Sequence, residues 1–283
     1  MYVDDLLSGL QQLGVGCHWG SDFVGAVFYA DDLALLAPSA AALQIMLRFC
    51  ESFGLEHWLR FNTAKTQLIH FDCAKLSLHS DHFVLCGSSL PFADSVLHLG
   101  HTLRYDLNDS DDIIGKTHDM IWKANCRLNT FSATDVLTKP KLFQSYFLSL
   151  YGSALWNLSC REIRTLEVAF NRVLRRISWS LLAHSHTAIV HCTAKMQNFF
   201  NIIMKRSTSL LSAAKASSSL IVRHIFSDSS ALSYTPTCFN VLYGHRYHKV
   251  YSSNDFSAAC VIRSICLSSS SVSEQLIVSL SCN

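Results

Sequence analysis

The sequence has few residues that interrupt helices and strands, with four prolines and eleven glycines among its 283 residues. Charge is also scarce, since 16% of the residues are charged whereas 49% are hydrophobic. Disordered segments have the opposite composition, because a chain with little apolar surface cannot offset the entropy lost on folding. The composition therefore excludes a disordered linker and predicts a folded chain of one large or two smaller domains.

Signals for secretion, disulfide frameworks and membrane spans are also missing. The eleven cysteines include no Cys-x-x-Cys pair, so neither a disulfide framework nor a zinc ribbon is indicated, and a reducing compartment is expected. Asp4 and Asp5 lie where a secretory signal needs basic and then apolar residues. The apolar run 142–158 contains five Ser, Asn or Gln residues and is shorter than the ~20 apolar residues of a membrane span. We predict an intracellular protein, in the cytoplasm or nucleus, without membrane contact.

The two signs of charge are unevenly distributed along the chain. Residues 1–114 contain fourteen acidic and five basic residues, a net charge of −9, whereas residues 115–176 carry +6 and residues 177–283 carry +5. An acidic part followed by a basic helical part suits metal ions on the one and phosphate groups on the other. A solvated helical face of Lys and Arg explains the basic part equally well.

Residues 1–110 have the pattern of mixed strands and helices. Two apolar runs on either side of a polar dipeptide predict a buried β-hairpin over residues 23–38. Ser39 is a favourable N-cap for a helix of about fourteen residues that Gly54 should end. Further short strands are predicted within residues 58–71, 83–85 and 96–103.

Residues 111–215 are predicted to be helical instead. Long amphipathic runs separated by short polar links predict helices at residues 113–131, 141–158, 161–177 and 194–214. Beyond about residue 215 the chain is rich in serine and weakly periodic, so no structure is assigned to residues 216–283. The sequence thus predicts an α+β fold in which a mixed first domain precedes an all-α domain.

Two adjacent carboxylates, Asp31 and Asp32, stand at the tip of the predicted apolar hairpin in the run Tyr29-Ala-Asp-Asp. Their mutual repulsion near a core needs an explanation, and a bound divalent cation is one. Carboxylates of this kind hold the two Mg²⁺ ions of nucleotidyl transfer. A plain β-turn, in which Asp is common, is the alternative.

Four motifs in this order resemble those of reverse transcriptases from LINE-type (non-LTR) retrotransposons, over roughly residues 1 to 225. The run Tyr29-Ala-Asp-Asp with its apolar flanks is similar to the metal-binding hairpin of the polymerase palm. Phe61-Asn-Thr-Ala-Lys65 is similar to the lysine motif that follows, and Leu97-His-Leu-Gly-His101 to the hairpin that grips the primer. Residues 133–176 are similar to the helical thumb.

This resemblance implies a partial polymerase palm over residues 1–110 and a thumb-like helical domain over residues 111–215. It implies that Asp31 and Asp32 bind Mg²⁺ for catalysis and that Lys65 protonates the departing pyrophosphate. The residues implied to contact nucleic acid are Leu99, Gly100 and His101 at the primer terminus and Arg172, Arg175 and Arg176 on the thumb. The implied partners are an RNA template, a DNA primer and a deoxynucleoside triphosphate, with no other small-molecule cofactor.

One part of the family's pattern is missing from the chain. In these enzymes the first catalytic aspartate lies on a palm strand upstream of the motifs found here, and the fingers domain lies further upstream. Met1 falls within a motif that precedes the palm hairpin in the family, so the chain is expected to be a fragment. Without a third carboxylate it is expected to be inactive alone. The alternative function is a non-catalytic remnant whose helical module binds nucleic acid.

Three other patterns are assigned structural roles. The run Tyr2-Val-Asp-Asp also has the Tyr-x-Asp-Asp pattern, but the residues after it predict a helix, whose first turn favours carboxylates. The histidines and cysteine within residues 184–192 lack the spacing of a zinc site. The tryptophans of the helical part are interpreted as packing residues rather than as base-stacking residues, namely Trp122, Trp156 and Trp179.

Overall fold

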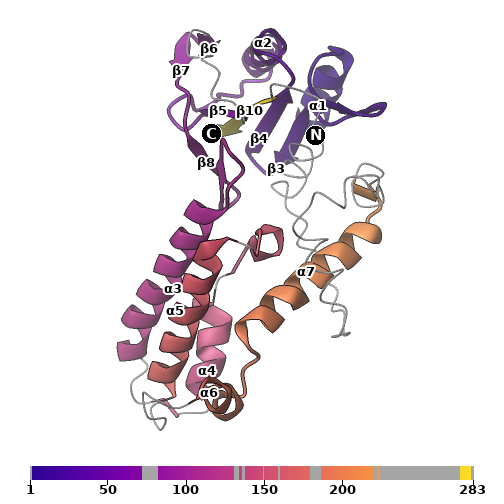
Figure 1. Cartoon of the computed structure of the whole chain (residues 1–283). Helices are drawn as coiled ribbons and strands as arrows, with labels where there is room; N and C mark the ends of the chain where they lie inside the picture. The colour runs from indigo at the N-terminus through magenta and orange to yellow at the C-terminus, as the bar shows by residue number, and fades with distance from the viewer. Residues whose placement is uncertain are drawn as a thin grey trace. The chain divides into compact units, whose positions relative to one another are not determined.

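The computed structural model describes residues 2–71, 82–130, 134–135, 138–148, 150–158, 160–178, 186–219, 222–223 and 275–281. The chain divides into two compact units. The first contains Met1–Asn108 with Ala214–Tyr234 and Phe256–Asn283, and the second contains Asp109–Ala213 with Thr235–Asp255. Strands occur in the first unit and helices make up the second, so the fold is α+β, as predicted (Figure 1).

The first unit combines two helices with short antiparallel strands. Its elements in chain order are α1 (Tyr2–Gln12), β1 (His18–Trp19), β2 (Asp22–Phe23), β3 (Ala26–Tyr29), β4 (Asp32–Ala37), α2 (Ala40–Glu56), β5 (Gln67–Phe71), β6 (Phe83–Leu85), β7 (Ser88–Leu90), β8 (Ser95–His98), β9 (His101–Arg104) and β10 (Gln275–Ser281). Asp4 and Asp5 lie in the first turn of α1, which confirms the helical interpretation of that run.

The main sheet of the first unit takes its third strand from near the end of the chain. Its order is β3-β4-β10-β5, and β10 is antiparallel to both of its neighbours (Figure 1). The strands β4 and β5, which are joined through α2, therefore run parallel to each other with β10 between them. The sequence analysis assigns no structure to residues 216–283 and so does not predict β10. The strand is a short apolar run that follows a long serine-rich segment, which gives it little periodicity to detect.

The helix α2 begins as predicted and ends later than predicted. The Ser39 hydroxyl accepts a hydrogen bond from the Ala42 amide at 3.2 Å, which confirms the N-cap. Gly54 does not end the helix, which continues to Glu56. A Cβ at position 54 would lie 2.9 Å from the Leu59 carbonyl oxygen, so the glycine is explained by close packing of the chain that follows.

The hydrophobic core of the first unit lies between the sheet and its two helices. Residues 33–37 of β4 are all buried, as expected for a strand with neighbours on both sides and helices over its face. Buried residues of α1 and α2 join the same core, including Leu10, Leu43 and Met46. This packing fixes β4, and with it the start of the strand at Asp32.

The second unit consists of helices and helical turns. Its elements are α3 (Ser110–Thr130), α4 (Thr138–Leu142), a π-helical turn η1 (Phe143–Phe147), a 3₁₀ turn η2 (Ser153–Leu155), α5 (Arg161–Ile177), α6 (Thr187–Ala194) and α7 (Phe199–Lys215). The predictions of helices at 113–131 and 161–177 are confirmed within a few residues. Among the described residues, no helix is long and apolar enough to cross a membrane.

One of the predicted helices is wrong and another begins later than predicted. The helix expected over residues 141–158 is broken after Phe147, and Gly152 adopts a left-handed φ of +80°. Apolar side chains on all sides of this run, including Phe143 and Trp156, enter the core, which a single straight helix could not achieve. The helix expected over 194–214 is confirmed in α7, which begins only at Phe199 because Lys195, with a φ of +51°, ends α6.

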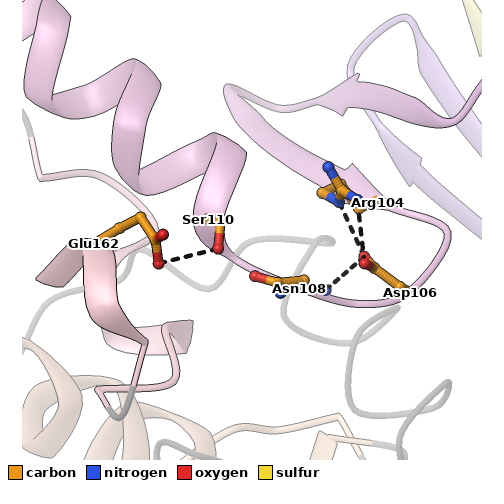
Figure 2. Close-up of polar contacts among 5 residues, drawn as sticks. All are labelled: Arg104, Asp106, Asn108, Ser110 and Glu162. Carbon is orange, nitrogen blue, oxygen red and sulfur yellow. Dashed lines mark hydrogen bonds and ion pairs between the residues drawn. The ribbon is translucent and has the colours of Figure 1, made fainter.

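A buried polar network holds the start of α3. The Asp112 carboxylate accepts a hydrogen bond from the Trp156 indole N–H at 2.7 Å, and the Asp109 carboxylate accepts one from the Asn157 amide at 2.7 Å. Both aspartates are 2% exposed. Figure 2 shows a further contact of the same helix, in which the Ser110 hydroxyl donates to Glu162 at 3.1 Å. These bonds connect α3 to the segment that leads into α5.

Candidate functional site

The Asp31–Asp32 pair lies at the turn of the hairpin formed by β3 and β4. Tyr29 pairs with Asp32 across the hairpin, so Ala30 and Asp31 form a two-residue turn. Ala30 has a left-handed φ of +53°, which costs a non-glycine residue about 1 kcal/mol or more. Asp31 is exposed and Asp32 is half-buried. The predicted hairpin is confirmed.

Lys65 lies at the end of a turn that leads into β5. The Asn62 carbonyl oxygen accepts hydrogen bonds from the amides of Lys65 and Thr66, and the Asn62 side chain also accepts from the Lys65 amide at 3.2 Å. The Thr66 hydroxyl donates to the same carbonyl at 2.9 Å. The backbone of Lys65 is therefore fixed, while its side chain is exposed.

The register of β10 brings these two segments to the same edge of the sheet. Ser279 pairs with Ala34 on β4 and with Gln67 on β5, and Ser281 pairs with Asp32. The strands β4 and β5 run parallel on either side of β10, so Asp32 at the start of β4 and the Lys65 turn before β5 lie toward the same end of the sheet. Two strand spacings of ~4.8 Å separate β4 from β5 by roughly 10 Å.

The hairpin of β8 and β9 carries two buried histidines beside its turn. His98 pairs with His101, and the turn residues Leu99 and Gly100 both have positive φ, as a tight two-residue hairpin requires. Burial lowers the pKa of His98, the Asp32 carboxylate raises it in part, and His101 lowers it further. β8 packs against β5, and the Ala93 amide before β8 donates to the Leu68 carbonyl oxygen of β5, so this hairpin lies beside the main sheet.

The residues proposed to grip a primer have very different exposures. Gly100 is exposed and Leu99 is partly exposed, whereas His101 is 1% exposed. The turn itself can therefore meet a ligand, while the His101 side chain faces the interior. The hairpin was predicted correctly from the sequence, but the burial of its histidines was not.

The turn of β3 and β4 carries two adjacent carboxylates. Asp31 and Asp32 are hard oxygen ligands of the kind that Mg²⁺ prefers. No group of three or more His, Cys, Asp or Glu residues that could hold a metal ion is found in the described part of the chain. A clamp for two ions therefore needs a further carboxylate.

The arginines form a continuous face on α5 that is broader than the sequence predicted. Arg161, Arg164, Arg172 and Arg176 are exposed, and Arg175 is partly buried. At 3.6 residues per turn all five lie within about 120° of the helix circumference. The opposite face of α5 is apolar and buried, with Leu166 and Phe170 at its centre. Sequence analysis named the last three arginines and missed the first two, although the same period identifies them.

Two of these arginines also have partners within the second unit. Arg175 donates to the Thr187 hydroxyl at 3.0 Å, and Arg176 donates to the Asn125 side chain at 2.5 Å. The latter contact links α5 to α3. Ser110 bonds to Glu162 near the N-terminal ends of both helices, whereas Arg176 bonds to Asn125 near their C-terminal ends. The two helices therefore lie side by side and run in the same direction. Arg172 is exposed on α5 between Glu162, which contacts Ser110, and Arg176, which contacts Asn125.

The other candidate residues of the sequence have structural surroundings. His186 caps α6 by accepting from the Ala188 amide at 3.3 Å, and His191 lies 2.9 Å from the Asn171 side-chain oxygen. Trp156 is buried, which confirms its packing role. Trp122 is 65% exposed, so its interpretation as a packing residue is wrong. His184 and Trp179 lie outside the described residues.

Comparison with protein-family models, with curated proteins and with solved structures finds no match to this chain. A functional proposal therefore rests on its own residues and their geometry.

Proposed function

We propose that this chain is the C-terminal palm and thumb part of an RNA-directed DNA polymerase of the non-LTR retrotransposon type, and that it does not polymerise alone. The observation that carries the proposal is the placement of three sequence motifs around one sheet. The Asp31–Asp32 turn and the Lys65 turn lead into β4 and β5, which run parallel on either side of β10. Asp32 also acts electrostatically on His98, which adjoins the β8–β9 turn.

Each of these groups has a role in the proposed chemistry. In nucleotidyl transfer two Mg²⁺ ions activate the attacking hydroxyl and neutralise the leaving pyrophosphate. Asp31 and Asp32 supply carboxylates on one side of the reaction, and the exposed Lys65 ammonium supplies a proton on the other. The Leu99–Gly100 turn offers exposed backbone for a primer terminus. Among the described residues, no group of three or more His, Cys, Asp or Glu side chains that could hold a metal ion is found, so the proposal does not include activity of the chain alone.

A gain of metal binding tests the site without requiring polymerase activity. Residues directly opposite in an antiparallel pair share one face of the sheet, and Tyr29 is opposite Asp32. Tyr29→Asp should therefore add a further carboxylate and raise the affinity for Mn²⁺, measured by calorimetry on the full chain, by about tenfold or more. Tyr29→Asn is the uncharged control. The proposal fails if Tyr29→Asp changes nothing, or if its gain survives Asp32→Asn.

Primer extension supplies the second test. The full chain should not extend a primer on an RNA template with either Mg²⁺ or Mn²⁺, because the carboxylates of one hairpin cannot hold both ions. Extension above the background, abolished by Asp31→Ala, would show that the chain contains a complete site.

The arginine face of α5 favours a second candidate function, a non-catalytic module that binds nucleic acid. Binding through phosphate contacts releases counterions, so affinity should fall steeply as salt is raised. Arg172→Gln combined with Arg176→Gln should reduce the slope of log K against log salt by about 1.4 for a single strand, which is ~0.7 for each contact. Binding that does not depend on salt or on these arginines would show that the arginine face does not bind nucleic acid.

A further inference from the structure

A large aromatic side chain on α3 is exposed within a helical turn of the contact between α3 and the arginines of α5. Trp122 on α3 is 65% exposed, although the other described tryptophan of this unit, Trp156, is fully buried. Residues three apart on a helix are neighbours, so Trp122 adjoins Asn125. Asn125 in turn accepts the hydrogen bond from Arg176 at 2.5 Å. One indole ring therefore lies within a helical turn of the point where α3 meets the arginines.

The charges around Trp122 favour an anionic ligand. Arg172 lies one turn before Arg176 on α5 and is exposed. The nearest acidic side chain on α3, Asp119, forms an ion pair with Lys123 at 2.6 Å, so these two charges offset each other. This part of the surface thus combines an exposed indole with the exposed guanidinium group of Arg172.

We propose that Trp122 is a base-stacking residue and that the second unit binds single-stranded nucleic acid. Phosphates contact the arginine face of α5 while an unpaired base stacks on the indole, as in other single-strand binding surfaces. Stacking needs the flat face of a free base, which a duplex does not present along its length. An acidic protein would use the arginines without requiring a stacked base. This inference rests on the nucleic-acid-binding part of the proposed function and specifies its ligand.

Labelled oligonucleotides distinguish stacking from charge attraction. Fluorescence anisotropy on the full chain would compare oligothymidine of 20 nucleotides with a strand of the same length that has a normal backbone and no bases. Because stacking contributes through the base alone, the wild-type chain should bind oligothymidine about 5- to 150-fold more tightly than the strand without bases. Trp122→Ala should remove that difference, and Trp122→Phe should retain most of it.

Trp58 provides a matched control, because it is 94% exposed and belongs to the first unit. Trp58→Ala should bind both strands like the wild-type chain. Trp122→Ala should also leave the salt slope unchanged, since the phosphate contacts persist, whereas Arg172→Gln should lower it.

The possible failures are separable. Equal binding of the two strands by the wild-type chain would overturn the stacking role while leaving the arginine face intact. Loss of oligothymidine and duplex binding to the same extent in Trp122→Ala would also overturn it. An absence of binding to any strand would overturn both this inference and the proposed nucleic-acid-binding role of the second unit, but would leave the metal test at Tyr29 and Asp32 unaffected.

Discussion

Asp109 and Asp112 in the second unit and Asp31 and Asp32 in the first unit lie in opposite environments. Asp109 and Asp112 in the second unit are buried, and each accepts a 2.7 Å hydrogen bond from the segment that holds Trp156. In the first unit Asp31 is exposed at a strained turn. Within the described part of the chain, no hydrogen bond or ion pair engages the Asp31 carboxylate.

This difference separates acids that stabilise the fold from acids that are available to a ligand. A buried carboxylate needs fixed donors, because it has lost its hydration. An exposed pair at a sheet edge keeps its hydration and can exchange water for a cation. The same residue type thus occurs in two environments, and burial with its bonding partners distinguishes them.

The strand β10 lies beside β4, which carries Asp32. We expect a substitution that breaks its pairing to cause the largest loss of stability in the first unit. Ile277 is in the middle of β10 and pairs with Leu36 on one side and Ile69 on the other. Ile277→Pro should lower the free energy of unfolding by more than about 3 kcal/mol, because proline cannot take part in the ladder of a central strand. Urea denaturation followed by circular dichroism measures the loss. Ile277→Val, which keeps the backbone N–H, is the control, and equal effects would show that β10 does not hold the sheet together.

The buried pair should be nearly as sensitive. Asp112→Ala leaves the Trp156 indole N–H without its acceptor in the core, so the free energy of unfolding should fall by about 2–3 kcal/mol. A double-mutant cycle with Trp156→Phe should show that the two losses are not additive. Additive losses would mean that this hydrogen bond does not anchor the start of α3.

Asp106 provides an intermediate case between the two pairs. Its half-exposed carboxylate accepts two hydrogen bonds from Arg104, at 3.0 and 3.1 Å, and one from the Asn108 amide, as Figure 2 shows. The hydrogen bond from Arg104 is the main cause that lowers the pKa of Asp106. Asp106→Asn should therefore cost less than about 1 kcal/mol, since the pair is exposed.

The sign of the pH dependence follows from the lowered pKa of Asp106. A folded-state pKa below the unfolded value gives stability that is fully present above the ordinary Asp pKa of about 3.9 and is lost as the pH falls through the folded-state pKa. The difference in unfolding free energy between the wild-type chain and Asp106→Asn should therefore shrink below about pH 4. A difference that grows in acid would contradict this account.

Local signals in the sequence predicted much of the first unit. The hairpin around Asp31, the N-cap at Ser39 and the β8–β9 turn each depend on a few neighbouring residues, which propensity and capping rules describe. The pairing of β10 could not be predicted, because it joins residues more than two hundred positions apart. The position of Asp32 and of the Lys65 turn at the same end of the sheet depends on that pairing.

The second unit shows the same limit in a different form. The regular period of α5 predicted its bounds and its arginines. The run from Phe143 to Trp156 is apolar on every side, so its period could not reveal where it bends into the core. Exposure of Trp122 is likewise decided by which face of α3 packs on α5, and α3 alone does not determine that choice.

One pair of matched variants tests the central claim, that the hairpin aspartates are kept for a ligand whereas the helix aspartates hold the fold. The measurement is the free energy of unfolding of Asp31→Asn and of Asp112→Asn in the full chain, in urea without added metal. We expect Asp31→Asn to be unchanged or more stable by up to ~1 kcal/mol, because it relieves repulsion from Asp32. Asp112→Asn should be less stable. A clear loss of stability in Asp31→Asn that equals the loss in Asp112→Asn would show that both pairs are structural, and it would contradict the account.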